Sequence, residues 1–174
     1  MLRLMLLRHA KTERTAPGER DRDRKLTKRG RADAPVIGAY LAQHHLVPDL
    51  VLVSPATRSQ ETWTLLSAAF ARKPKAVIAD RVYNATVEDL MAVIGEAGKA
   101  KTALVVGHNP GLHDLALELI ASGDAEARAR LNEKLPTSGL VLIDFPIDDW
   151  SHLHPQSGRI ERFVSPHLIA TATE

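Results

Sequence analysis

The segment LRLMLLRHAKT, residues 2–12, gives the strongest indication of the fold. Residues 2–7 form an apolar run of strand length, and a polar loop follows it at once. Arg8 and His9 therefore stand at the carboxyl end of a buried strand, where the chain leaves the core. In open α/β sheets this is the edge at which ligands bind.

Apolar runs of strand length alternate with amphipathic helical patterns along the rest of the chain. Ser54-Pro55 is typical of a helix N-cap followed by proline at the first helical position, and residues 86–89 form a capping-box-like pattern. Continuous apolar strands between amphipathic helices favour an α/β fold, a three-layer α/β/α sandwich with a mostly parallel central sheet. We predict strands at residues 2–7, 49–53, 75–79, 102–106, 139–145 and 159–164, and helices at 27–45, 55–70, 86–98 and 112–121.

The composition suits one globular domain over residues 1–174, with 44% hydrophobic and 25% charged residues. The absence of cysteine excludes disulfides, thiolate zinc sites and a cysteine nucleophile. The apolar N-terminus is short and contains Arg3, which argues against a signal peptide, and no segment reaches the roughly 20 apolar residues that span a bilayer. We therefore expect a cytoplasmic protein without a membrane partner.

The formal net charge of +2 is too small to indicate a nucleic-acid partner. One dense basic cluster spans residues 11–31, where lysines and arginines are interleaved with Glu13, Glu19, Asp21 and Asp23. This pattern predicts a solvated, self-neutralising loop and helix start. The alternative is a positive rim that attracts a phosphorylated or acidic partner.

Three short motifs follow predicted strands and should meet at one edge of the sheet. They are RHAKT at 8–12, SPATRSQET at 54–62 and GHNPGL at 107–112. Two arginines and two histidines, Arg8, Arg58, His9 and His108, could thus line one pocket. Such a pocket has many hydrogen-bond donors and no obligatory acceptor, which suits a dianionic phosphoryl group.

In these motifs, in their order and spacing, the sequence resembles the histidine phosphatase superfamily, also called phosphoglycerate mutase-like. The RHAKT form, DRKLTKRG at 23–30, VYNA at 82–85 and the short length are similar to phosphohistidine phosphatases of the SixA type. The resemblance implies a phosphohistidine phosphatase that needs no metal or other cofactor. Its partner would be a phosphorylated protein carrying phosphohistidine, or a small phosphorylated substrate.

The resemblance also implies roles for individual residues. His9 would attack phosphorus and become transiently phosphorylated, while Arg8, Arg58 and His108 would hold the phosphoryl oxygens. Asn109, in the same turn as His108, is included in the predicted substrate-binding set. A nucleophilic imidazole must be neutral with one nitrogen free, and neighbouring positive groups help by lowering its pKa.

The sequence departs from larger members of the superfamily after the third predicted strand. They usually carry there an acidic residue that protonates the leaving oxygen, whereas residues 80–85 read DRVYNA, without a glutamate. Asp80, Glu88 and Asp89 lie nearby, but Glu88 and Asp89 are equally explained as residues of a helical first turn. Whether Asp80 or Glu88 acts as a general acid is left open.

Two rival functions use the same site: a phosphatase of small phosphoesters or phosphosugars, and a non-catalytic phosphate-binding module. His9 and His108 argue against the second, since binding alone needs no nucleophilic imidazole. Asp21-Arg22-Asp23 is similar to the paired aspartates of magnesium-dependent phosphatases, but it lies in the middle of a loop. The pairs His44/His45 and His152/His154 lack a carboxylate partner at metal-ligand spacing, so we expect no metal site.

Overall fold

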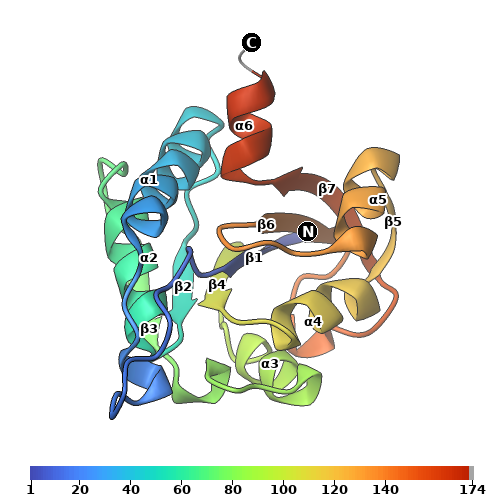
Figure 1. Ribbon diagram of the computed structural model, residues 1–174. Helices are drawn as coiled ribbons and strands as arrows, with labels where there is room; N and C mark the ends of the chain where they lie inside the picture. The colour runs from blue at the N-terminus through green and yellow to red at the C-terminus, as the bar shows by residue number, and fades with distance from the viewer. Residues whose placement is uncertain (173–174) are drawn as a thin grey trace.

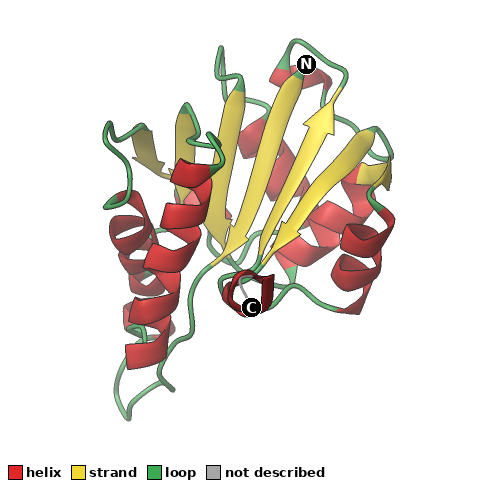
Figure 2. Ribbon diagram, turned by 90° about the horizontal axis from the view of Figure 1, so that it is seen from above, coloured by secondary structure: helices red, strands yellow, loops and turns green. Residues whose placement is uncertain are grey.

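A seven-stranded sheet, in the order β3-β2-β4-β1-β6-β7-β5, forms the middle layer of the computed structural model, which describes residues 1–172 (Figure 2). The β1–β4, β2–β4, β2–β3 and β5–β7 pairs are parallel, and the β1–β6 and β6–β7 pairs are antiparallel. The strands are β1 (Leu2–Arg8), β2 (Leu50–Val53), β3 (Lys75–Ile78), β4 (Thr102–Gly107), β5 (Ile120–Gly123), β6 (Leu140–Phe145) and β7 (Gly158–Val164).

Helices cover both faces of this sheet (Figure 1). The α-helices are α1 (Lys28–Gln43), α2 (Thr57–Ser67), α3 (Val87–Ile94), α4 (Gly111–Leu119), α5 (Ala125–Glu133) and α6 (Pro166–Ala172), and the 3-10 helices are η1 (Asp21–Asp23), η2 (Asp80–Val82) and η3 (Trp150–His152). The predicted three-layer sandwich with a mostly parallel sheet is thus confirmed. No helix within residues 1–172 is long and apolar enough to cross a membrane.

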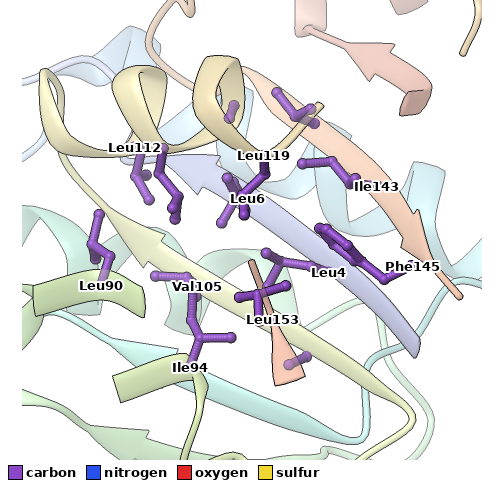
Figure 3. Close-up of a cluster of buried hydrophobic side chains, with 14 of the residues drawn as sticks. Leu4, Leu6, Leu90, Ile94, Val105, Leu112, Leu119, Ile143, Phe145 and Leu153 are labelled. Atoms are coloured by element: carbon purple, nitrogen blue, oxygen red, sulfur yellow. The ribbon is translucent and has the colours of Figure 1, made fainter. Parts of the chain in front are cut away.

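The central strand β1 is apolar from Leu4 to Leu7 because both of its faces are buried there. Leu4 and Leu6 point into the core formed with α3, α4 and α5 (Figure 3), while Met5 and Leu7 contact the core under α1 and α2. Successive side chains of a strand point to opposite faces, so one run of leucines and a methionine serves both layers. The carboxyl end of β1 is held in the middle of the sheet.

The loop after β1 is fixed by α1 and α2. Thr27 caps α1, its side chain accepting a hydrogen bond from the Gly30 amide at 3.1 Å. A Cβ on Gly30 would collide with the carbonyl of Lys11, so glycine permits the start of α1 to pack directly on this loop. From α2, Thr62 accepts a hydrogen bond from the Ala10 amide at 3.0 Å. The residue after β1, His9, is therefore held from two sides.

Several elements differ from the sequence prediction. The predicted helix at 112–121 ends at Leu119, and residues 120–123 form the edge strand β5. Helix α5 was not predicted because it buries only Ala127 and Leu131, too few residues for a clear helical period. The predicted cap at Ser54-Pro55 is wrong, because α2 begins at Thr57.

Candidate active site

His9 follows β1 directly and is fixed by its backbone and its ring. Its amide donates to the Gly107 carbonyl at 3.0 Å, and its carbonyl accepts from the Ser138 amide at 3.1 Å. Nδ1 lies 2.8 Å from the Ala10 carbonyl. A carbonyl can only accept, so Nδ1 carries the hydrogen and Nε2 keeps a lone pair in the neutral ring.

The surroundings of His9 keep its ring neutral. Its side chain is buried, and this burial is the main cause that lowers the pKa of His9 to about 4. The positive charges of Arg58, Arg8 and Arg24 lower this pKa further, while the hydrogen bond to the Ala10 carbonyl opposes them. At neutral pH the imidazole is therefore uncharged and has a free nitrogen.

His108 follows β4, the neighbour of β1, and its ring centroid lies 5.2 Å from that of His9. Burial, then the charges of His9 and Arg58, lower the pKa of His108 to about 3. Its Nε2 lies 2.6 Å from the hydroxyl of Ser54, which follows β2 and is fully buried. The hydroxyl that the sequence assigned to a helix cap therefore contacts a predicted site residue instead.

Arg58 stands in the first turn of α2 and is 4% exposed. Its Nη1 donates to the Asp21 carbonyl at 2.8 Å, and its Nη2 donates to Asp21 Oδ2 at 3.0 Å. The Tyr83 hydroxyl donates to the same carboxylate oxygen at 2.6 Å, and its ring lies 5.5 Å from that of His108. Asp21 and Tyr83 thus connect the basic segment at 11–31 to the site.

Asp21 was not predicted as a site residue. The hydrogen bond from Tyr83, and then those from Arg58, lower the pKa of Asp21 to about 2, so its carboxylate is ionised at neutral pH. The charges of the segment at 11–31 were predicted to neutralise one another in solvent. Asp21 departs from this prediction, because its carboxylate turns inward and accepts a hydrogen bond from Arg58. Tyr83 belongs to the VYNA segment, and Asp21 lies just before DRKLTKRG, so both lay within or beside stretches already singled out.

Arg8 and Asn109 converge on one backbone group. Arg8 Nη1 donates to the Leu135 carbonyl at 3.2 Å, and Asn109 Nδ2 donates to the same oxygen at 2.9 Å. Arg8 also acts on His9 through its charge. Asn109, predicted to bind substrate, uses its amide nitrogen on the protein and keeps the acceptor Oδ1.

Buried polar atoms without a partner are concentrated in this site. Within residues 1–172 they include Arg8 Nε, Arg58 Nε and His108 Nδ1, together with Asn109 Oδ1. Leaving a buried polar group unpaired costs about 1–3 kcal/mol, so such groups are rare unless they serve a ligand or reaction. The structure therefore brings together all the predicted site residues and leaves nitrogen atoms of three of them unpaired.

The candidate acids lie in different places. Asp80 is exposed and borders a cavity with Arg81 and Glu96, distinct from the cavity that His108 lines. Glu88 is also exposed but lines a cavity of about 530 Å³ with His108 and Asn109. Asp89 completes the capping box of α3, as its side chain accepts from the Thr86 amide at 3.0 Å.

The other histidine pairs lie outside this site. The His44 ring packs on Tyr40 at 4.2 Å, and His154 Nδ1 donates to the His152 carbonyl at 2.8 Å. In the part of the chain that the structure describes, no group of three or more His, Cys, Asp or Glu residues is arranged to hold a metal ion.

Comparison with known proteins relates this site to a family. Residues 4–82 match the model of the histidine phosphatase superfamily, branch 1. An uncharacterized protein of Mycobacterium tuberculosis strain H37Rv is 34% identical over 163 residues, covering 92% of this chain and 99% of the relative.

Solved structures agree in fold over almost the full length. A crystal structure from Agrobacterium tumefaciens, provisionally described as the phosphohistidine phosphatase SixA, is 33% identical with a TM-score of 0.81, covering 95% of this chain and 98% of that chain. A protein histidine phosphatase SixA complexed with tungstate is 20% identical with a TM-score of 0.75, covering 97% of this chain and 99% of that chain. The phosphoglycerate mutase-like fold and the resemblance to the SixA type are confirmed, and the chain therefore belongs to the histidine phosphatase superfamily and is a phosphatase.

Proposed function

We propose that the protein is a phosphohistidine phosphatase that forms a covalent phosphohistidine on Nε2 of His9 and needs no metal ion. The observation that carries this proposal is the 2.8 Å hydrogen bond from Nδ1 of His9 to the Ala10 carbonyl. It reserves the lone pair of Nε2 for attack, and the pKa of about 4 keeps that lone pair free at neutral pH.

The unpaired nitrogens around His9 support a phosphoryl group as the electrophile. Arg8 Nε, Arg58 Nε and His108 Nδ1 have no partner within residues 1–172. A transferring phosphoryl group carries its charge on three equatorial oxygens, which such nitrogens can bind as N–H donors. Asp21 accepts one hydrogen bond from each terminal nitrogen of Arg58, and the buried Nε keeps its N–H without a partner within residues 1–172.

The reaction proceeds in two displacements. Nε2 of His9 attacks phosphorus while the P–N bond of the substrate breaks, and the bonding electron pair returns to the departing imidazole. Water then attacks the phosphorylated His9, the new P–N bond breaks, and orthophosphate and free His9 are formed. The positive groups of Arg8 and Arg58 oppose the charge of the transition state in both steps.

The placement of the carboxylates favours a phosphoramidate over an alkyl ester. An alkoxide leaving group needs a proton, which a general acid supplies for about 10²–10⁴ in rate. Asp21 is ionised and bonded to Arg58, and Asp80 borders a different cavity. An imidazole already protonated on its other nitrogen leaves as a neutral molecule, so phosphohistidine needs no strong acid.

A phosphatase of small phosphoesters is the second candidate, and one observation favours it. Glu88 lines the same cavity as His108 and Asn109, so it is the candidate acid that shares a cavity with a site residue. The two candidates share the nucleophile His9 and differ in the need for this acid.

A substrate panel distinguishes them. Phosphohistidine peptides, phosphoserine peptides, phosphosugars and an aryl phosphate are assayed with and without chelator. We expect the highest kcat/KM for phosphohistidine, unchanged by chelator. A preference for an alkyl phosphate would support the second candidate, and loss of activity in chelator would contradict the metal-independent mechanism.

Rapid quenching tests the covalent step. We expect wild-type protein to trap acid-labile, base-stable phosphate, and His9→Ala to trap none and to lose turnover while keeping its fold. His167→Ala is a matched control, since His167 is exposed and lines another cavity. Acid-stable label on the wild type would reject a phosphohistidine intermediate.

A further inference from the structure

The contacts of Ser54 are those of a hydrogen-bond partner of His108 and not those of a helix cap. It follows β2, is fully buried, and is anchored by its amide, which donates to the Val106 carbonyl at 3.0 Å. Its hydroxyl oxygen lies 2.6 Å from His108 Nε2. Because α2 begins at Thr57, capping does not explain a buried hydroxyl at this position.

Counting the protons of this contact indicates its direction. The Ser54 hydroxyl has one hydrogen, and its oxygen already accepts from the Ala56 amide at 3.3 Å. A neutral imidazole also has one hydrogen, on Nδ1 or on Nε2, and the partner of one nitrogen decides which. The pKa of about 3 makes His108 neutral at neutral pH.

Only one of the two tautomers satisfies the hydroxyl. If Nε2 of His108 carried the hydrogen, it would donate to Ser54, and the hydroxyl hydrogen would have no acceptor among residues 1–172. Nδ1 of His108, which is buried and has no partner within residues 1–172, would then carry a lone pair in place of a hydrogen. If Ser54 donates to Nε2, the hydroxyl hydrogen has its acceptor and Nδ1 carries N–H.

We propose that Ser54 is a positioning residue whose hydroxyl donates to Nε2 of His108 and holds His108 in the tautomer with a hydrogen on Nδ1. That N–H then donates to a phosphoryl oxygen, a step that rests on the proposed function. The opposite tautomer would set a lone pair against that oxygen and repel it. Ser54 therefore acts on the reaction through His108 without contacting the substrate.

The tautomer can be measured without any substrate. Nitrogen-15 NMR of the wild-type protein, labelled on histidine and kept at neutral pH, distinguishes a protonated ring nitrogen from an unprotonated one. We expect His108 to show protonated Nδ1 and unprotonated Nε2. Protonated Nε2 would overturn the proposal whatever the enzyme hydrolyses. Absence of phosphohistidine turnover with the expected tautomer would reject the proposed function and leave the role of Ser54 in place.

A pair of variants tests the consequence for catalysis. Ser54→Ala removes the donor to His108, and we expect kcat with a phosphohistidine peptide to fall about 10- to 100-fold with little change in KM, because the lost hydrogen bond acts on the developing charge. The His108 ring nitrogens should also lose the defined tautomer of the wild type. Ser67→Ala is the matched control, since Ser67 is also buried and its hydroxyl donates to the Thr64 carbonyl at 3.2 Å, at the opposite end of α2 from Arg58.

The rates of the two variants separate a positioning role from a packing role. Ser67→Ala should stay within about twofold of the wild type. Equal losses in both variants would indicate a packing effect, and an unchanged rate in Ser54→Ala would show that His108 needs no such partner. Either result would overturn the proposal. If Ser54→Ala does not fold, the tautomer of His108 in the wild type is sufficient to support or overturn it.

Discussion

Lowering the pH from about 8 to about 5 should destabilise the fold through two buried histidines. Burial is the largest cause that lowers the pKa of His9 to about 4 and that of His108 to about 3, from an ordinary value of 6.5. Since both folded values lie below the unfolded one, the unfolded chain takes up protons first as the pH falls. Their contribution to stability is complete above pH 6.5 and is lost as the pH falls toward 4 and 3.

The magnitude follows from the difference between pH 5 and the unfolded pKa. At pH 5 both rings are largely neutral in the folded state and charged in the unfolded state, which costs about 2 kcal/mol for each histidine. The total of about 4 kcal/mol is a large part of the 5–15 kcal/mol typical of a domain. Asp21 has a folded pKa of about 2, so its contribution to the free energy of unfolding is lost only below its ordinary pKa of 3.8. The change in stability between pH 8 and pH 5 therefore reports on the two histidines and not on Asp21.

Urea unfolding at the two pH values measures this loss. The buffers must contain no phosphate or sulfate, because an anion that binds only the folded state adds stability of its own. We expect the wild type to lose about 4 kcal/mol more between pH 8 and pH 5 than His9→Gln/His108→Gln, which has no titrating ring at either position. An equal loss in the double variant would refute the assignment of these two pKa values.

Three further tests concern the candidate acids, Asp21 and Thr62. Asp80→Asn and Glu88→Gln should each lower turnover of a phosphohistidine peptide by less than about tenfold, whereas a loss of two or more orders of magnitude would identify that carboxylate as the acid. Asp21→Ala should lower kcat/KM by about tenfold or more, because the buried Arg58 loses its bond to the Asp21 carboxylate, and an unchanged kcat/KM would contradict that role. Thr62→Val should destabilise the protein by about 1–3 kcal/mol in thermal unfolding by leaving a buried amide unpaired, and an unchanged melting temperature would show that this amide finds another partner.

The sequence predicted the positions of His9, Arg58 and His108 because they follow continuous apolar strands. Strands β1, β2 and β4 are parallel neighbours, so their carboxyl ends must meet at one edge. This geometry follows from the sheet alone and needs no knowledge of side-chain contacts. Among the elements that were missed, β5 and α5 lie at the other end of the sheet and bury few side chains, and α6 buries none.

The roles of Asp21, Tyr83 and Ser54 could not be predicted in the same way. Tyr83 and Asp21 are 62 residues apart and meet through loop packing, which leaves no periodic pattern. Asp21 stands among alternating charges, a pattern typical of a solvated surface. Ser54 precedes proline, and this pair is typical of a helix start. In each case the local pattern had an ordinary explanation, and only the tertiary contact showed another use.

The unpaired nitrogens that suit this site to a phosphoryl group also limit its stability. Each of Arg8 Nε, Arg58 Nε and His108 Nδ1 costs about 1–3 kcal/mol while it lacks a partner. Asp21 gives each terminal nitrogen of Arg58 a partner, but Nε of Arg58 has none within residues 1–172. The Asp21 carboxylate lies beside a terminal nitrogen of Arg58, so an incoming oxyanion can bind the unpaired Nε. In the proposed mechanism, stability lost at these atoms is recovered when the substrate binds, which would concentrate binding free energy at the phosphorus that His9 attacks.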